Sequence, residues 1–306
     1  MPIYYPDILE QKKRPRTFTY SHKDVLLYSL GVGMGRDPMD QRELPFVCEK
    51  DIRVLPTAAT VLASAGVQRS GPPPSQRPCL RTSELNLGML VHGEQKIEQH
   101  KPLPSFGTFT AATRTIDAYD KGKEKGAVVV DETVWTDENG EKVATLTDST
   151  FARADGGFGG PSQGGPEPHL VPTRKPDVLV SFDTRPDQAL LYRLNGDLNP
   201  LHSDPDFAKR AGFARPILHG LCTFGITCRA VLQTFCGYDP TMIMSHQARF
   251  SAPVFPGDTI MVDLWKDGNV ISFEARVIDR GTTVIKNGKT ELRSSARAPV
   301  ASEPFY

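Results

Sequence analysis

The chain has 306 residues, of which 39% are hydrophobic and 24% are charged. These values fit a globular protein built as two domains or as one large composite domain. Lysine plus arginine and aspartate plus glutamate both number 36, so the formal net charge is zero. The balance disfavours nucleic acid or an anionic membrane as a partner recognised through overall charge.

The sequence carries no recognisable address for a membrane or for export. Its apolar runs are far shorter than the roughly 20 residues of a membrane-spanning helix. The first residues, MPIYYPDILEQKKRPR, place charges where a signal peptide has its apolar core, and the last, ASEPFY, differ from an SKL-type peroxisomal signal. We therefore expect a cytoplasmic protein, with a peroxisomal location as the alternative. Five cysteines without a CxxC pair indicate reduced thiols and not a structural zinc site: Cys48, Cys79, Cys222, Cys228 and Cys236.

The first half of the chain contains one helix candidate followed by alternating strands. Residues 57–66, TAATVLASAG, form a short apolar segment with helical periodicity. Strand-like runs follow at 113–120, 126–136 and 142–151, and the turn sequences KGKEKG and DENG separate them. Such turns between alternating runs predict antiparallel hairpins.

A composition break follows at residues 155–177, which contain six glycines and five prolines. Neither a helix nor a regular strand persists in such a segment. We interpret it as a connector between an N-terminal domain, 1–154, and a C-terminal domain, 178–306. A phosphate-binding loop at GGFGG is the alternative, but the Lys-Ser/Thr that should follow such a loop is missing.

The second half repeats the order of helix and strands. Residues 221–236 carry an apolar stripe suited to burying one helix against a sheet. Strand-like runs follow at 269–279 and 282–292, with the turn sequences KDGN and KNGK. Each half also shows a Gln, a Pro-containing bend and a Gly before its strands. The repeat predicts an α+β fold in which an antiparallel sheet wraps a helix twice. The stripe consists of Leu221, Phe224, Cys228, Val231, Leu232 and Phe235.

The segment NGDLNPLH, residues 195–202, brings an acid, an amide and an imidazole onto one short loop. Asp197, Asn199 and His202 lie within six residues, and Gly196 and Pro200 prevent a regular helix. A water that attacks a substrate must be oriented and deprotonated, which takes at least two such groups. Taken singly, the Asp and the Asn are also typical of loop-stabilising Asx turns, and the His of a satisfied buried histidine.

Two neighbouring features frame this loop. Asp204 and Pro205 have the pattern of a helix N-cap followed by proline, so we assign them to structure. Downstream, PILHG leads into the apolar helix, where the first turn has unpaired N–H groups. The amide of Gly220 suits an oxyanion hole because no side chain blocks a ligand carbonyl. Close helix–sheet packing is the alternative reason for a glycine there.

The stretch YRLNGDLNPLHSDPDFAKRAGFARPILHGLCTFG closely resembles the signature of the 2-enoyl-CoA hydratase 2 family, the MaoC-like (R)-specific hydratases. The same domain occurs in the peroxisomal multifunctional enzyme. The resemblance extends over nearly the whole chain through LYSLGVGMGRDP, VLPT, LVHGEQ, YDKG, GGFGG and ARFSAPVFPGDT. It implies a tandem, or double, hot-dog fold with a long central helix in each half. It further implies that the C-terminal half is catalytic and that the degenerate N-terminal half makes room for the acyl tail.

Carried over position by position, the resemblance assigns roles to individual residues. Asp197 and His202 would activate the water, Asn199 would help to hold it, and the Gly220 amide would bind the thioester carbonyl. Glu49 lies near a glutamate position of the family, but its spacing to LPT is two residues short, which puts its role in doubt. The residues expected to contact the CoA thioester are His92, Gly93, Lys121, Asn195 and Phe250.

The resemblance implies reversible hydration of a trans-2-enoyl-CoA to the (R)-3-hydroxyacyl-CoA, within fatty-acid or related β-oxidation. Such chemistry needs no metal and no cofactor, since CoA is part of the substrate, and we expect a homodimer. A hot-dog acyl-CoA thioesterase and a non-catalytic acyl-CoA-binding subunit remain the alternatives. The length or bulk of the acyl chain cannot be read from these residues.

Overall fold

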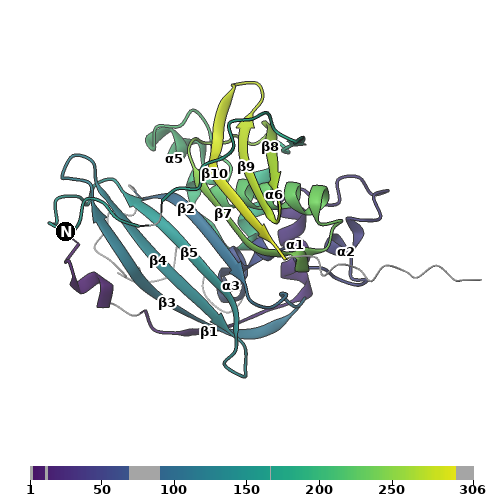
Figure 1. Ribbon diagram of the computed structural model, residues 1–306, viewed down its shortest axis with the longest axis horizontal. Helices are drawn as coiled ribbons and strands as arrows, with labels where there is room; N and C mark the ends of the chain where they lie inside the picture. The colour runs from purple at the N-terminus through teal and green to yellow at the C-terminus, as the bar shows by residue number, and fades with distance from the viewer. Residues whose placement is uncertain (1–2, 11–12, 69–89, 166, 294–306) are drawn as a thin grey trace, which may run out of the picture.

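The computed structural model describes residues 3–10, 13–68, 90–165 and 167–293. Its strands form one ten-stranded antiparallel sheet in the order β1-β3-β4-β5-β2-β7-β10-β9-β8-β6 (Figure 1). The strands are β1 (Arg16–Tyr20), β2 (Leu90–Gln99), β3 (Gly107–Asp120), β4 (Ala127–Thr136), β5 (Lys142–Ala152), β6 (Val178–Asp183), β7 (Ile243–Phe250), β8 (Thr259–Asp267), β9 (Val270–Val277) and β10 (Thr282–Leu292). The α-helices are α1 (His22–Gly31), α2 (Leu44–Val47), α3 (Ala59–Gln68), α4 (Gln188–Tyr192), α5 (Pro205–Arg210) and α6 (Gly220–Phe235). The 3-10 turns are η1 (Asp7–Glu10), η2 (Pro56–Ala58), η5 (Arg193–Asn195), η6 (Pro200–His202) and η7 (Pro240–Met242).

The sheet consists of two five-stranded parts, one from each half of the chain. They join where β2 pairs with β7, with Glu94 opposite Arg249 and Ile97 opposite His246. All the pairings are antiparallel, as the hairpin signals predict. Four of the five predicted strands are confirmed within two residues at their ends, whereas β3 begins at Gly107, six residues before its predicted start at residue 113.

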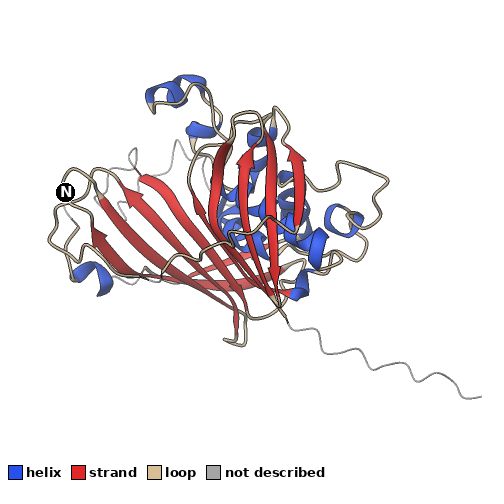
Figure 2. Ribbon diagram, turned by 45° about the horizontal axis from the view of Figure 1, so that its top comes forward, coloured by secondary structure: helices blue, strands red, loops and turns tan. Residues whose placement is uncertain are grey.

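The two central helices differ in length. Helix α6 has 16 residues and lies against the C-terminal strands (Figure 2), whereas α3 has 10 residues and follows the turn η2. The predicted stripe of α6 is confirmed, because Phe224, Cys228, Val231 and Leu232 are buried. The predicted start of the first-half helix at residue 57 is two residues early, since η2 precedes α3.

Close packing of α1 against α6 requires a glycine. A Cβ on Gly225 would lie 2.5 Å from Cγ1 of Val32 and 2.6 Å from the hydroxyl of Tyr28. The buried side chains of both halves then form one continuous hydrophobic cluster, which includes Trp135 of β4 and Phe273 of β9. The two sheet parts therefore share a core.

Three of the four predicted turn sequences connect strands, and the fourth does not. KGKEKG, DENG and KDGN lie between β3 and β4, β4 and β5, and β8 and β9. KNGK, by contrast, lies inside β10 and forms a bulge there, so its assignment as a hairpin turn is wrong. Asn287 adopts φ 56°, and the pairing register shifts between Lys286 and Lys289. A Cβ on Gly288 would lie 2.3 Å from the Phe273 ring, so the glycine of this Asn-Gly pair allows β10 to approach β9 closely.

The connector contains no helix or strand among its described residues. The backbone N–H groups of Gly157 and Gly159 donate to the Asp120 carboxylate at 2.8 and 2.7 Å, and Gly122 does so from the other side at 2.8 Å. An internal carboxylate thus occupies the amides that a phosphate loop would offer. In the described part of the chain, no helix has the length and apolar character needed to cross a membrane. Cys79 lies outside the described residues.

Candidate active site

The loop from residue 195 to residue 205 is built from short turns that fix each polar side chain. Gly196 adopts φ 121°, a conformation that favours glycine, and so allows η5 to end there. The side chain of Asn199 accepts the Leu201 N–H at 3.0 Å and caps η6. Asp204 accepts from the N–H groups of two residues of α5, so the predicted N-cap is confirmed. The Oδ1 atom of Asn199 is thus used as an acceptor within the loop, and its Nδ2 amide is the group that can donate to a bound water.

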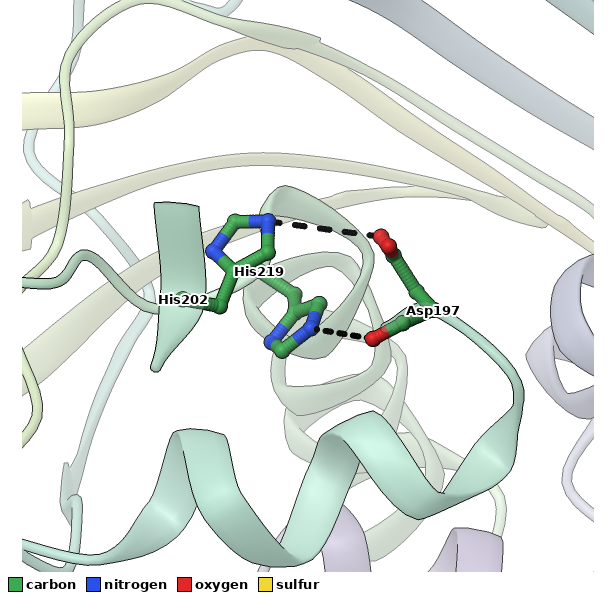
Figure 3. A group of neighbouring side chains, drawn as sticks. All are labelled: Asp197, His202 and His219. Atoms are coloured by element: carbon green, nitrogen blue, oxygen red, sulfur yellow. Dashed lines mark hydrogen bonds and ion pairs between the residues drawn. The ribbon is translucent and has the colours of Figure 1, made fainter. Parts of the chain in front are cut away.

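Asp197 and His202 face each other across the mouth of this loop. The Nε2 atom of His202 lies 4.0 Å from Oδ2 of Asp197 (Figure 3). The Nδ1 atom of His202 donates to the carbonyl oxygen of Ile217 at 2.8 Å. That bond fixes the tautomer, so the Nε2 lone pair points toward Asp197 as a proton acceptor. A separation of 4.0 Å is too long for a direct hydrogen bond and suits a shared water.

A third residue, His219, completes the cluster, and the sequence reasoning missed it. Its ring stacks on that of His202 with centroids 3.7 Å apart, and its Nε2 donates to the main-chain carbonyl of Asp197 at 3.2 Å (Figure 3). It stands immediately before Gly220 in PILHG, which was the signal available in the sequence.

Burial keeps both histidines of this cluster neutral. It lowers the pKa of His202, against the opposing effects of the Ile217 hydrogen bond and the negative charge of Asp197. Burial, together with the charge of a protonated His202, lowers the pKa of His219 to about 3. At neutral pH the His202 Nε2 lone pair is therefore free to take a proton.

The same three residues have the composition of a metal site, but their geometry fits an acid–base site better. One ligand-type atom from each of Asp197, His202 and His219 lies within 4.8 Å of the other two. Two imidazoles and a carboxylate can hold a divalent metal ion. Stacked rings, however, direct their lone pairs along neighbouring lines and not toward one point, and the His219 Nε2 already donates to a carbonyl. The cluster is therefore arranged to handle a proton.

Three further predicted residues meet beside this cluster. Gly220 is the first residue of α6, so its amide has no partner within the helix. A Cβ at this position would lie 3.3 Å from the Phe250 ring, which shows how closely that ring covers the helix start. The His92 ring meets Phe250 edge-on at 4.9 Å, and the charge of Asp197 acts on its pKa. Burial outweighs that charge and lowers the pKa of His92 to about 4.

Two predicted CoA contacts lie along the N-terminal sheet. Gly93 forms a bulge in β2, because His92 pairs with Thr150 while Glu94 pairs with Ser149, and a Cβ on Gly93 would meet the Ser149 hydroxyl at 2.8 Å. Lys121 lies beyond β3, where its Nζ donates to the Ser162 carbonyl at 2.8 Å. The strands β4 and β5 separate β3 from the strand that carries His92.

The side chains of the remaining two predicted residues make their contacts away from Asp197 and His202. Asn195 is 2% exposed, donates to the Tyr192 carbonyl at 2.9 Å and packs against Gly31 of α1. Glu49 lines a surface groove along α1 together with residues that include Leu26 and Leu30. The Asn199 N–H donates to the Asp197 carboxylate at 3.1 Å. The structure thus brings together six of the predicted residues: Asp197, Asn199, His202, Gly220, Phe250 and His92.

Comparison with known proteins identifies the family of the chain. Residues 18–154 match the family model described as MFE-2 hydratase 2 N-terminal domain, and residues 169–288 match the MaoC like domain. The enoyl-CoA hydratase ChsH3 of Mycobacterium tuberculosis is 41% identical over 288 residues, which are 94% of this chain and 98% of that protein. The chain belongs to the enoyl-CoA hydratase 2 family. The peroxisomal enoyl-CoA hydratase 2 of Arabidopsis thaliana is 37% identical, over 94% of this chain and 95% of that protein.

Solved structures confirm the fold of the present chain, a member of the enoyl-CoA hydratase 2 family. A MaoC-like dehydratase from Phytophthora capsici matches with a TM-score of 0.84 and 36% identity, over 96% of this chain and all of that one. The Mycobacterium tuberculosis protein RV0216, described as a double hotdog fold, matches with a TM-score of 0.54 at 12% identity, over 95% of this chain and 98% of that one. The predicted tandem hot-dog fold of class α+β is confirmed.

Proposed function

We propose that this protein catalyses the reversible hydration of a trans-2-enoyl-CoA to the (R)-3-hydroxyacyl-CoA. The observation that carries the proposal is the 4.0 Å gap between Oδ2 of Asp197 and Nε2 of His202, beside the start of α6. A water in this gap has a carboxylate and a neutral imidazole as acceptors for its protons. The hydratase names of the aligned relatives point to the same chemistry.

In the hydration direction, the Gly220 amide binds the thioester carbonyl oxygen and draws electron density from C3. His202 and Asp197 remove a proton from the water as its oxygen forms the bond to C3. The electrons of the C2=C3 bond move toward the carbonyl oxygen, giving an enolate that the Gly220 N–H stabilises. C2 then takes the proton from the Asp197–His202 pair on the same face, which restores both groups. Asn199 holds the water through its Nδ2 amide.

The CoA part of the substrate lies along the residues that flank this gap. We assign His92 and Phe250 to the thioester end, because they contact each other beside Gly220. Gly93 forms the bulge in β2 next to His92. We assign Lys121 to the distal part of CoA. Asn195 stabilises the loop through its hydrogen bond to the Tyr192 carbonyl. The N-terminal domain, 1–154, shapes the pocket for the acyl tail, and the connector, 155–177, links it to the catalytic domain, 178–306.

The reaction uses acid–base groups of the protein alone, so the proposal includes neither a metal ion nor a cofactor. It places the enzyme in fatty-acid or related β-oxidation, as a homodimer. It also places the enzyme in the cytoplasm, although five aligned relatives are named as peroxisomal. Gel filtration and expression of a fluorescent fusion test the oligomeric state and the location.

The decisive experiment follows the ultraviolet absorbance of the conjugated enoyl thioester with crotonyl-CoA and a series of longer substrates. Asp197→Asn and His202→Gln should each lower kcat by about 10²–10⁴-fold, the usual contribution of a general acid–base group. The matched control is Asp204→Asn, two residues beyond His202, because asparagine caps a helix as well as aspartate does. That variant should keep the wild-type rate. Loss of absorbance with release of free thiol would instead indicate a thioesterase, and binding without turnover a non-catalytic subunit.

A further inference from the structure

His219 occupies the N-cap position of a helix, but its side chain does not cap that helix. It is the N-cap residue of α6, with φ −58° and ψ 134°, yet its side chain makes no capping hydrogen bond. N-cap positions favour Ser, Thr, Asp and Asn because their short side chains reach the free N–H groups of the first turn. The imidazole of His219 instead turns back toward the loop of residues 195–205. Its placement is therefore explained by what the ring contacts there.

The ring makes two contacts with residues far away in the sequence. Its Nε2 donates to the main-chain carbonyl of Asp197, 22 residues earlier, at 3.2 Å. Its face stacks on His202, 17 residues earlier, at 3.7 Å and an interplanar angle of 26°. Gly220 follows His219 directly in the chain. One residue thus contacts or adjoins three of the groups that the proposed reaction uses: Asp197, His202 and Gly220.

The hydrogen bonding of the two ring nitrogens shows that His219 does more than fill space in the core. His219 is 2% exposed, and its Nδ1 has no hydrogen-bond partner among the described residues. Leaving a buried polar atom unpaired destabilises the folded protein. A phenylalanine would fill the same place, beside the Tyr192 ring at 5.0 Å, without that cost. The feature that only the imidazole supplies is the Nε2–H bond to Asp197. Because that nitrogen already donates, His219 is not itself the base.

We propose that His219 is a positioning residue for the water-activating pair. It holds Asp197 through the main chain and His202 through the ring, so that the carboxylate and the His202 Nε2 face one water at a fixed distance from the Gly220 amide. The inference rests on the proposed hydratase function and adds a residue to it. Because the His219 ring is 2% exposed and its Nε2 donates to a main-chain carbonyl, its loss should affect the rate of the chemical step and not substrate binding.

Two substitutions separate the contacts of His219. His219→Phe keeps a ring for stacking and removes the donor, whereas His219→Gln keeps a donor and removes the ring. A misplacement of about 1 Å in an active site can cost roughly 10²-fold in rate. We expect His219→Phe to lower kcat for crotonyl-CoA about 10- to 100-fold with KM within about threefold, and His219→Gln to lose less. If His219→Phe does not fold, His219→Gln carries the same test.

The control is a second buried histidine on the same domain that does not touch the site. His246 is fully buried and stacks on Phe273 at 4.7 Å. His246→Gln should lower the melting temperature and leave kcat unchanged at pH 7. If kcat falls in proportion to the melting temperature in His246→Gln and in His219→Phe alike, His219 has a structural role only. A kcat within about threefold of wild type in both His219 variants, or a rise in KM alone, would also overturn the inference.

A double variant gives a readout that a structural role would not produce. If His219 acts through Asp197, Asp197→Asn combined with His219→Phe should be no more than about threefold slower than Asp197→Asn alone. Independent losses that multiply would contradict the inference. Wild-type hydration is measured in the same series. An inactive wild type therefore rejects the proposed function, while an active wild type with unaffected His219 variants rejects only the role of His219.

Discussion

His246 shows how a neutral imidazole can be fixed inside a core. The hydroxyl of Thr227 donates to the Phe224 carbonyl, so its oxygen accepts from Nε2 of His246 at 3.1 Å. The Nδ1 atom must then accept the Thr290 hydroxyl proton at 2.7 Å. Both nitrogens are satisfied in one tautomer of the neutral ring. A second proton would break the Thr290 bond and place a charge in the protein interior, and burial accordingly lowers the pKa of His246 to about 3.

This arrangement predicts that acid destabilises the protein partly through His246. In the unfolded chain the imidazole has a pKa near 6.5, so the unfolded state binds the extra proton first. The free energy of unfolding should therefore fall as the pH drops from 6.5 toward 3, by roughly 1.4 kcal/mol per pH unit from this residue. Urea unfolding of wild type and His246→Gln between pH 7 and pH 4 measures it. Equal slopes for the two proteins would refute the prediction.

At the residue scale, the sequence could predict what lies close along the chain. Asp197, Asn199 and His202 fall within six residues, and Asp204 shows its capping role directly. The use of Asn199 as a cap was an alternative that the sequence alone could not decide. The contacts of His219 depend on how α6 approaches the loop, which no local pattern contains.

At the scale of elements, the GGFGG segment has a structural role that composition alone does not reveal. The carboxylate of Asp120, at the end of β3, accepts three backbone N–H groups from two loops. These bonds, foremost those from Gly157 and Gly159, lower the pKa of that carboxyl. The glycine-rich composition predicted a connector without regular structure, but the acceptor for its amides lies about 37 residues earlier, beyond the reach of any local pattern.

Removing that acceptor should loosen the loop without unfolding the sheet. In Asp120→Ala, the amides of Gly157 and Gly159 should exchange with deuterium at least about tenfold faster, because their bonds to the carboxylate are lost. The Gly140 amide, which donates to the Asp137 carbonyl, provides an internal reference and should not change. Hydrogen exchange followed by NMR distinguishes the two classes. Unchanged protection at both glycines would mean that other contacts hold the loop.

At the scale of the molecule, the repeat in the sequence predicts two similar halves but not how they join. The pairing of β2 with β7 makes one sheet, and the shared core contains side chains from both halves. A buried ion pair adds a third connection. Glu43, 3% exposed and preceding α2, accepts from Arg229 of α6 at 2.7 Å and from the Gly35 N–H at 2.7 Å. A single sequence does not indicate that two residues 186 positions apart form an ion pair.

The ion pair gives the sharpest test of whether the halves unfold together. Arg229 also donates to the Gly33 carbonyl at 2.7 Å, so Arg229→Met leaves both a carboxylate and a carbonyl without this donor. Removing one partner of a buried pair typically costs about 3–5 kcal/mol, whereas replacing both by apolar residues is often close to neutral. We therefore expect Arg229→Met to destabilise strongly and Glu43→Leu combined with Arg229→Met to recover part of the loss. Because the core and sheet are continuous, calorimetry should show a single transition in all three proteins, with equal van't Hoff and calorimetric enthalpies. Two separated transitions in Arg229→Met would mean that the halves are independent and that the pair only holds them together.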